Sequence, residues 1–107
     1  MTTFDELWAW YGQAPRPANV ADRVGGVALA DLDDDVQEVA SRHQGRRAAE
    51  FAAGDDVLLV RDLARLGLAV ADLTRVLPAI GPAATHACFA RVAALGRAML
   101  VDVARGT

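Results

Sequence analysis

Apolar side chains recur along residues 83–105 with the period of an α-helix, and no other pattern in the chain constrains the fold as strongly. A helix with one apolar face has to bury that face against another element. The sequence therefore predicts a long final helix that packs against other helices. The residues that share its apolar face are Cys88, Phe89, Val92, Leu95, Gly96, Met99, Leu100 and Val103.

Three further segments carry helical patterns. Residues 57–66 and 70–80 read as two short helices separated at Gly67, and Gly81-Pro82 ends the second. Residues 31–53 read as a helix with acidic residues at its start, and Gly45 leaves open whether it is one kinked helix or two. Residues 20–30 fit either a short helix or a turn leading into an extended piece.

The first helix is marked by an unusual concentration of aromatic residues. Four of the six aromatic residues lie in the first eleven positions, and Thr3 and Glu6 have capping-box spacing. One stripe of this helix carries Phe4, Leu7, Trp8 and Tyr11, whereas Trp10 points away from it. The stripe fits docking onto the chain's own core or into a groove of a partner. We favour its own core, because a small bundle needs the buried area.

Strand signals are weak, since period-2 alternation is poor and Asn-Gly or Asp-Gly hairpin turns are absent. The fold class predicted is all-α, a small single-domain helical bundle of about four to six helices. In this layout residues 1–12 form the aromatic helix, residues 13–19 a loop containing Pro15 and Pro17, and residues 20–107 the bundle.

Composition indicates the type of protein and the cellular compartment in which it folds. The chain of 107 residues is 53% hydrophobic and 23% charged, as in globular proteins. The single cysteine, Cys88, excludes an internal disulfide and fits a reducing compartment. No apolar run is long enough for a membrane span, and the start lacks the features of a signal peptide. We therefore expect a cytoplasmic protein that does not enter a membrane.

Charge argues against a nucleic-acid binder. The net charge is −3, and it divides into −6 over residues 1–56 and +3 over residues 57–107. The arginines of the second half are spread singly, whereas nucleic-acid binders concentrate basic residues on one face. Tight sequence-specific binding of nucleic acid is therefore not expected.

Residues that could carry chemistry do not form a recognisable site. The acidic run 31–38 lacks the ligand spacing of di-metal bundles and EF-hands, so it reads as a solvated helix start. His86 and Cys88 are two residues apart and project from different sides of a helix, and nothing positions His43 beside Cys88. We expect no catalytic residues, no metal, no cofactor and no small-molecule substrate, and hence not an enzyme.

Residues 61–77 suggest one alternative function. Two short helices joined at Leu66-Gly67-Leu68 would form a helix-turn-helix. The segment resembles the helices that follow the wing in MerR-type regulators, on Leu66, Gly67, Val70, Asp72, Leu73 and Leu77. That resemblance implies a DNA-associated regulator with a long dimerisation helix, here residues 83–105. The family's DNA-reading helix pair and Arg-Tyr-Tyr signature have no counterpart in residues 1–56, so membership is not inferred.

The function predicted is a non-catalytic helical protein–protein interaction or regulatory module that self-associates, as a homodimer, or binds a protein partner. Gly96 within the last helix would let another helix approach closely. The alternatives are a transcriptional regulator using residues 61–77 and an accessory subunit or chaperone of a larger assembly. The residues predicted to bind the partner are Phe4, Trp8, Trp10, Tyr11, Met99 and Leu100.

Overall fold

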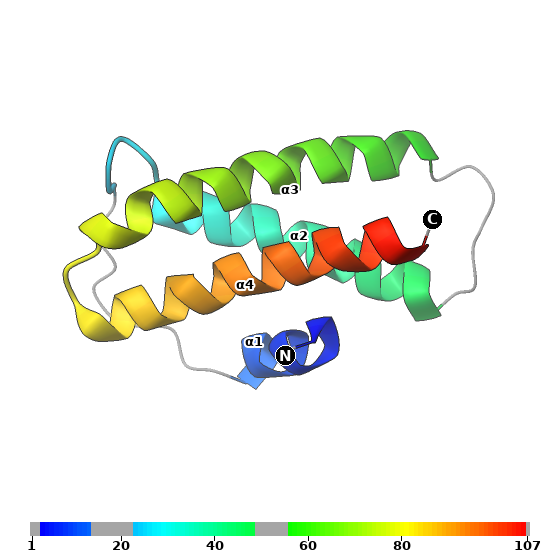
Figure 1. The fold of residues 1–107 in the computed structure, drawn as a ribbon, viewed down its shortest axis with the longest axis horizontal. Coiled ribbons are helices and arrows are strands. Elements are labelled where there is room, and N and C mark those ends of the chain that lie inside the picture. Colours follow the sequence, from blue (N-terminus) through cyan, green and yellow to red (C-terminus); the bar gives the residue numbers. More distant parts are fainter. Residues whose placement is uncertain (1–2, 14–22, 49–55, 107) are drawn as a thin grey trace.

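Four α-helices make up the described part of the chain, which covers residues 3–13, 23–48 and 56–106 of a computed structural model (Figure 1). Among these residues the sole β pairing is an isolated bridge between Val24 and Val27. The predicted all-α fold is therefore confirmed. The elements are α1 (Phe4–Gln13), α2 (Leu29–Ala48), α3 (Asp56–Val76), a 3₁₀ turn η1 (Leu77–Ala79) and α4 (Ala83–Gly106).

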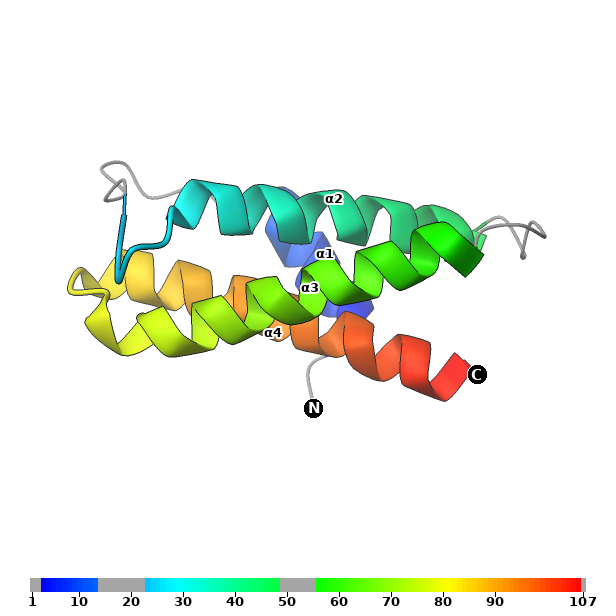
Figure 2. The ribbon, with the colours of Figure 1, turned by 90° about the horizontal axis from the view of Figure 1, so that it is seen from above.

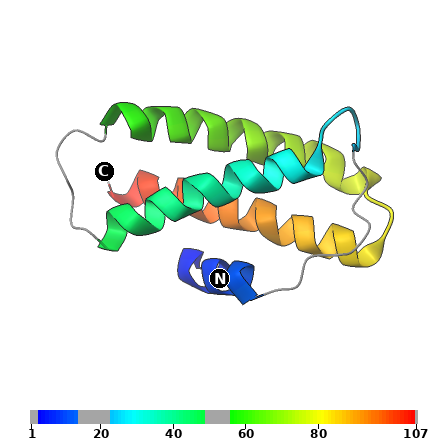
Figure 3. The same ribbon diagram turned by 180° about the vertical axis from the view of Figure 1, so that it is seen from behind.

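The three long helices, α2, α3 and α4, lie side by side, and the short α1 runs across α2 and α4 on the side away from α3 (Figures 1 and 3). α3 and α4 are antiparallel neighbours joined through η1. The molecule is thus a three-helix bundle with one aromatic helix laid across it.

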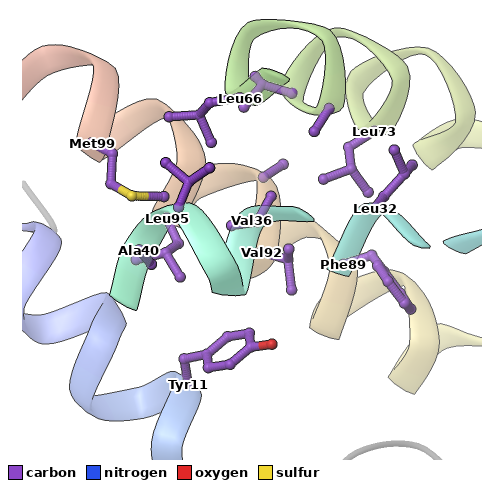
Figure 4. Close-up of a cluster of buried hydrophobic side chains, with 14 of the residues drawn as sticks. Tyr11, Leu32, Val36, Ala40, Leu66, Leu73, Phe89, Val92, Leu95 and Met99 are labelled. Carbon is purple, nitrogen blue, oxygen red and sulfur yellow. The ribbon is translucent and has the colours of Figure 1, made fainter. Parts of the chain in front are cut away.

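The core lies where the three long helices meet (Figure 4). Leu66 and Leu73 of α3 point towards Val36 of α2 and towards Val92 and Leu95 of α4, and all five are at most 1% exposed. The predicted apolar face of α4 packs into this core. Its buried residues are Cys88, Phe89, Val92, Leu95, Gly96 and Met99.

Two local features fix the ends of helices. The amide of Glu6 donates a hydrogen bond of 3.3 Å to Thr3 Oγ1, which caps α1 as the sequence predicted. Residues 23–28 form a tight turn before α2, in which Gly25 and Gly26 have φ values of 56° and 80°. Positive φ favours glycine, so the Gly25-Gly26 pair makes a turn rather than a short helix.

One boundary prediction is wrong. Residues 57–66 and 70–80 are not two helices separated at Gly67, because α3 continues through Gly67 to Val76. A glycine inside a helix costs about 1 kcal/mol relative to alanine, which buried side chains on both sides offset. Leu66, Ala69 and Leu73 are buried along one unbroken stripe that supplies this burial.

Gly45 likewise lies inside a single helix, α2, over the range described. The predicted loop at 13–19 begins beyond Gln13, and its prolines Pro15 and Pro17 lie outside the described residues.

Candidate protein-interaction surface

The aromatic stripe of α1 is docked on the chain's own bundle. Phe4, Leu7 and Tyr11 are 2%, 6% and 8% exposed. The ring of Phe4 meets the ring of His43 of α2 edge-on, with centroids 4.8 Å apart. Tyr11 donates a hydrogen bond of 2.8 Å from its hydroxyl to Asp33 Oδ1. Phe4 and Tyr11 are therefore core residues in this structure rather than exposed anchors.

The two tryptophans are half-buried, and each lies against other side chains of its own chain. The ring of Trp8 stacks beside Phe4 at 6.2 Å and beside Tyr11 at 5.7 Å, measured between centroids. Trp10, which leaves the stripe as expected, has the Arg91 guanidinium carbon 5.2 Å from its ring centroid. The surroundings of both tryptophans therefore depend on the docking of α1 against the bundle. Part of each tryptophan side chain remains exposed to solvent.

The predicted partner-binding residues of α4, Met99 and Leu100, lie mostly inside the molecule. Met99 is 1% exposed and Leu100 is half-buried. A Cβ atom at Gly96 would lie 2.5 Å from Val70 Cγ2, so the helix that approaches Gly96 closely is α3 of the same chain. The apolar face of α4 is covered within the monomer because α2 and α3 both pack on it.

The exposed large hydrophobic residues of the described chain lie elsewhere. Val60 and Leu68 of α3 are 65% and 71% exposed, and Val101 of α4 is 46% exposed. At 100° per residue, Val60 and Leu68 fall within the same arc of about 100° on α3, opposite its buried stripe. Seen from above, α3 lies in front of α2 and α4, so this arc faces outwards (Figure 2). We define the α3 outer face as Val60, Ala64, Gly67, Leu68 and Ala71.

Val101 lies on a different side of the molecule, the outer side of α4. Gly96 faces Leu66 and Val70 of α3, and at 100° per residue Val101 lies about 140° around α4 from Gly96. Val101 therefore points away from α3 and does not continue the α3 outer face.

The outer side of α2 has the opposite character. Between residues 31 and 44 its exposed positions are all polar: Asp31, Asp34, Gln37, Glu38, Ser41 and Gln44. The exposed side of α2 is therefore polar and acidic, whereas the exposed positions described on α3 combine an apolar stripe with polar residues on its flanks and at its end: Val60, Ala64, Leu68 and Ala71 with Arg61, Arg65, Thr74 and Arg75. Clustering of exposed apolar residues on one side of a small protein is typical of an interaction surface.

Charged residues join α2 to α3 beside that surface. Asp62, 2% exposed, accepts hydrogen bonds from Arg42 Nε to both carboxylate oxygens, at 3.1 and 2.9 Å. Arg42 Nη1 also donates to Glu38 at 2.9 Å, and Arg65 pairs with Asp35 and Glu38 at 2.6 and 2.8 Å. Asp35 and Glu38, in the second half of the acidic run 31–38, therefore help to hold α2 against α3.

The same ion pairs shift the pKa values of the side chains that form them. The hydrogen bond from Arg42 and then the charge of Arg65 lower the pKa of Glu38 below its ordinary value. Hydrogen bonds to Asp62 and then Glu38 raise the pKa of Arg42, and the bond to Asp35 raises the pKa of Arg65. All three groups are therefore held in their charged forms.

The histidines and the cysteine are kept apart. His43 is 7% exposed, and its Nε2 lies 3.2 Å from Asp102 Oδ2 across the α2–α4 contact. Cys88 is buried in α4, while His86 is exposed. Within the described ranges no three His, Cys, Asp or Glu residues are placed to hold a metal ion.

The helix-turn-helix that the alternative function would use at 61–77 is not formed, since α3 is one helix across Gly67. Two of its three arginines are used within the chain. Arg65 pairs with α2, and Arg75 donates to the carbonyl of Gly25 at 3.2 Å and lies 3.5 Å from Asp72. The arginines of this segment therefore do not form a separate basic face.

Comparison with known proteins gives no relative to reason from: no family model, no curated protein and no solved structure matches the chain. Among the helices in the described ranges, none is both long and apolar enough to cross a bilayer. The exposed surface of the chain is therefore the evidence for its function.

The α3 outer face was not predicted from the sequence, for one physical reason. Val60, Ala64, Leu68 and Ala71 form a stripe only when residues 56–76 are one helix, and Gly67 was read as a break. The available signal was the spacing i, i+4, i+8, i+11 on the side opposite Leu66, Ala69 and Leu73.

Proposed function

We propose that this chain is a non-catalytic helical protein-interaction module that docks through the α3 outer face. The observation that carries the proposal is the exposure of Leu68, 71% in the middle of a 21-residue helix that is buried on its opposite side. An exposed leucine alone means little, but Leu68 shares its face with Val60 and three small residues.

The composition of the face supports docking of another helix. The centre of the face carries only small side chains, at Ala64, Gly67 and Ala71, which project little from the helix backbone. A Cβ added at Gly67 would meet nothing within 4 Å. Small residues at the centre allow two helix backbones to approach, while Val60 and Leu68 supply apolar side chains to bury. The proposed partner element is therefore a helix with an apolar stripe.

The test is affinity capture from an extract of the native host, with three forms of the chain immobilised separately. They are the unchanged chain, Leu68→Glu, and the matched control Ser41→Glu on the exposed side of α2. Glutamate is a good helix former, so both variants keep the helix and add the same charge. Circular dichroism verifies that each is folded.

We expect the unchanged chain and Ser41→Glu to retain the same proteins and Leu68→Glu to lose them. An identical set bound by all three forms, or no protein above the bare support, would contradict the proposal.

A further inference from the structure

We infer that the α3 outer face binds a second copy of this chain, with the two α3 helices antiparallel about a two-fold axis near Gly67 and Leu68. This inference rests on the proposed function and adds the identity and geometry of the partner. Two observations carry it: the small residues are arranged symmetrically about the middle of α3, and its charges are arranged self-complementarily.

The small residues match themselves across such an axis. In an antiparallel pair centred between Gly67 and Leu68, Ala64 comes level with Ala71 of the partner subunit and Gly67 with the partner subunit's Leu68. Leu68 and Gly67 lie about 100° apart on α3, on opposite flanks of the face, so Leu68 packs beside Leu68 of the partner subunit on one flank and the two glycines leave the other flank open. Helices with small residues at the crossing point pack at the short end of about 8–10 Å between axes.

The charges along one edge of the face are also complementary. Arg61 and Asp72 lie on the same flank, about 100° and 120° around α3 from Val60. A two-fold axis of this kind brings each flank against the same flank of the other copy. Arg61 then comes within about 3 Å, along the helix axis, of Asp72 of the partner subunit, and the reverse pair forms equally.

No like charges meet at the centre. Arg75 lies within the arc of the face, about 60° around α3 from Val60, but near the end of the helix. It donates to the carbonyl of Gly25 and lies 3.5 Å from Asp72 of its own chain, which directs it towards the turn at 23–28. Arg65 is held by Asp35 and Glu38 on α2. The centre of the face is therefore apolar, and its edge carries one attractive pair on each side of the axis.

Sedimentation equilibrium on the purified full chain, from about 1 to 200 µM, tests the inference with charge exchanges. Arg61→Asp places two carboxylates together across the axis, and Asp72→Arg places two guanidinium groups together. Each should weaken the dimer about tenfold or more. Asp34→Arg, an exposed change on α2 with the same change in charge as Asp72→Arg, is the control and should leave the dimer unchanged.

Restoration of the dimer is the decisive arm. The double variant Arg61→Asp/Asp72→Arg re-forms both attractive pairs and should dimerise within about threefold of the unchanged chain. An equimolar mixture of the two single variants should form a heterodimer, because each introduced charge then faces its opposite. A merely damaged fold would be rescued in neither experiment.

Three results would overturn the inference. One is a monomer at every concentration, and another is a dimer that Leu68→Glu or the single exchanges leave intact. The third is weakening by the single exchanges without rescue in the double variant or the mixture. Any of these leaves the proposed function to the capture experiment, where loss of other proteins by Leu68→Glu would still support docking on this face.

Discussion

Gly96 and Gly45 both lie inside helices, yet their surroundings differ. At Gly96 a Cβ atom would lie 2.5 Å from Val70 Cγ2 and 3.4 Å from Leu66 Cδ1, whereas at Gly45 it would meet nothing within 4 Å. Gly96 is thus required by the close contact of α3 with α4. Gly45 has no packing role of this kind in the described structure.

We therefore predict opposite effects of the same substitution. Gly96→Ala should lower the free energy of unfolding by about 1–3 kcal/mol, because overpacking forces the helices apart. Gly45→Ala should raise it by about 0.5–1 kcal/mol, because alanine loses less backbone entropy in a helix. Urea unfolding followed by circular dichroism measures both. A Gly96→Ala variant as stable as Gly45→Ala would show that α3 and α4 do not meet closely at Gly96.

The pKa shift of Glu38 gives a second residue-level prediction. Its native pKa lies below the ordinary value of 4.5, so pairing with Arg42 and Arg65 stabilises the fold fully above that pH. The contribution is lost as the pH falls below 4.5 through the lowered native pKa. The melting temperature of Glu38→Gln should therefore lie below that of the unchanged chain at pH 7, and the gap should shrink towards pH 3. A gap independent of pH would contradict this.

Among the elements, α1 differs from the others because it is short and lies across the bundle. A helix of 10 residues is marginal alone in water, so α1 depends on the burial of Phe4, Leu7 and Tyr11. Both tryptophans of the chain, Trp8 and Trp10, lie on α1. Tryptophan fluorescence consequently reports the docking of this helix, while circular dichroism reports the whole bundle.

Phe4→Ala should weaken that docking by about 3–4 kcal/mol, through lost burial and the cavity left against His43. The fluorescence transition in urea should then come at a lower concentration than the dichroism transition. Gln13→Ala, at the exposed end of α1, is the control and should keep the two transitions together. Coincident transitions in Phe4→Ala would show that α1 is not separately docked.

Helical periodicity was sufficient to predict the existence of α1, α2 and α4. The final helix was expected over 83–105 and spans Ala83–Gly106, and the self-docked interpretation of the aromatic stripe agrees with the buried Phe4 and Tyr11. The continuity of α3 was not predicted, because local propensity at Gly67 indicates a break and the compensating burial of Leu66 and Leu73 comes from tertiary packing.

The same limit applies to the predicted contact residues. A helical wheel shows that Met99 and Leu100 belong to an apolar face, but not how far the neighbouring helices cover it. In the structure Met99 is 1% exposed, while Val101, on the outer side of α4, is 46% exposed. Which edge of an amphipathic helix stays in water depends on the packing of α1, α2 and α3, which no local pattern encodes.

At the scale of the whole molecule, the exposed surfaces of the neighbouring helices α2 and α3 differ in polarity. The exposed residues of α2 between 31 and 44 are polar, whereas α3 exposes an apolar stripe of Val60, Ala64, Leu68 and Ala71 between its charged residues. A stable bundle does not require this difference, since Ser41 and Leu68 are both exposed mid-helix positions. We interpret it as a requirement of binding, and the central claim is that binding occurs on the α3 outer face.

A dilution series of ¹H–¹⁵N correlation spectra on the unchanged chain, from about 1 mM to 20 µM, tests that claim most directly. Amide signals of Val60, Ala64, Gly67, Leu68 and Ala71 should shift with concentration. Signals of Asp34, Gln37 and Ser41 on α2 should stay constant. Spectra that do not change with concentration, or shifts that gather on α2 or on Trp10 of α1, would contradict the account.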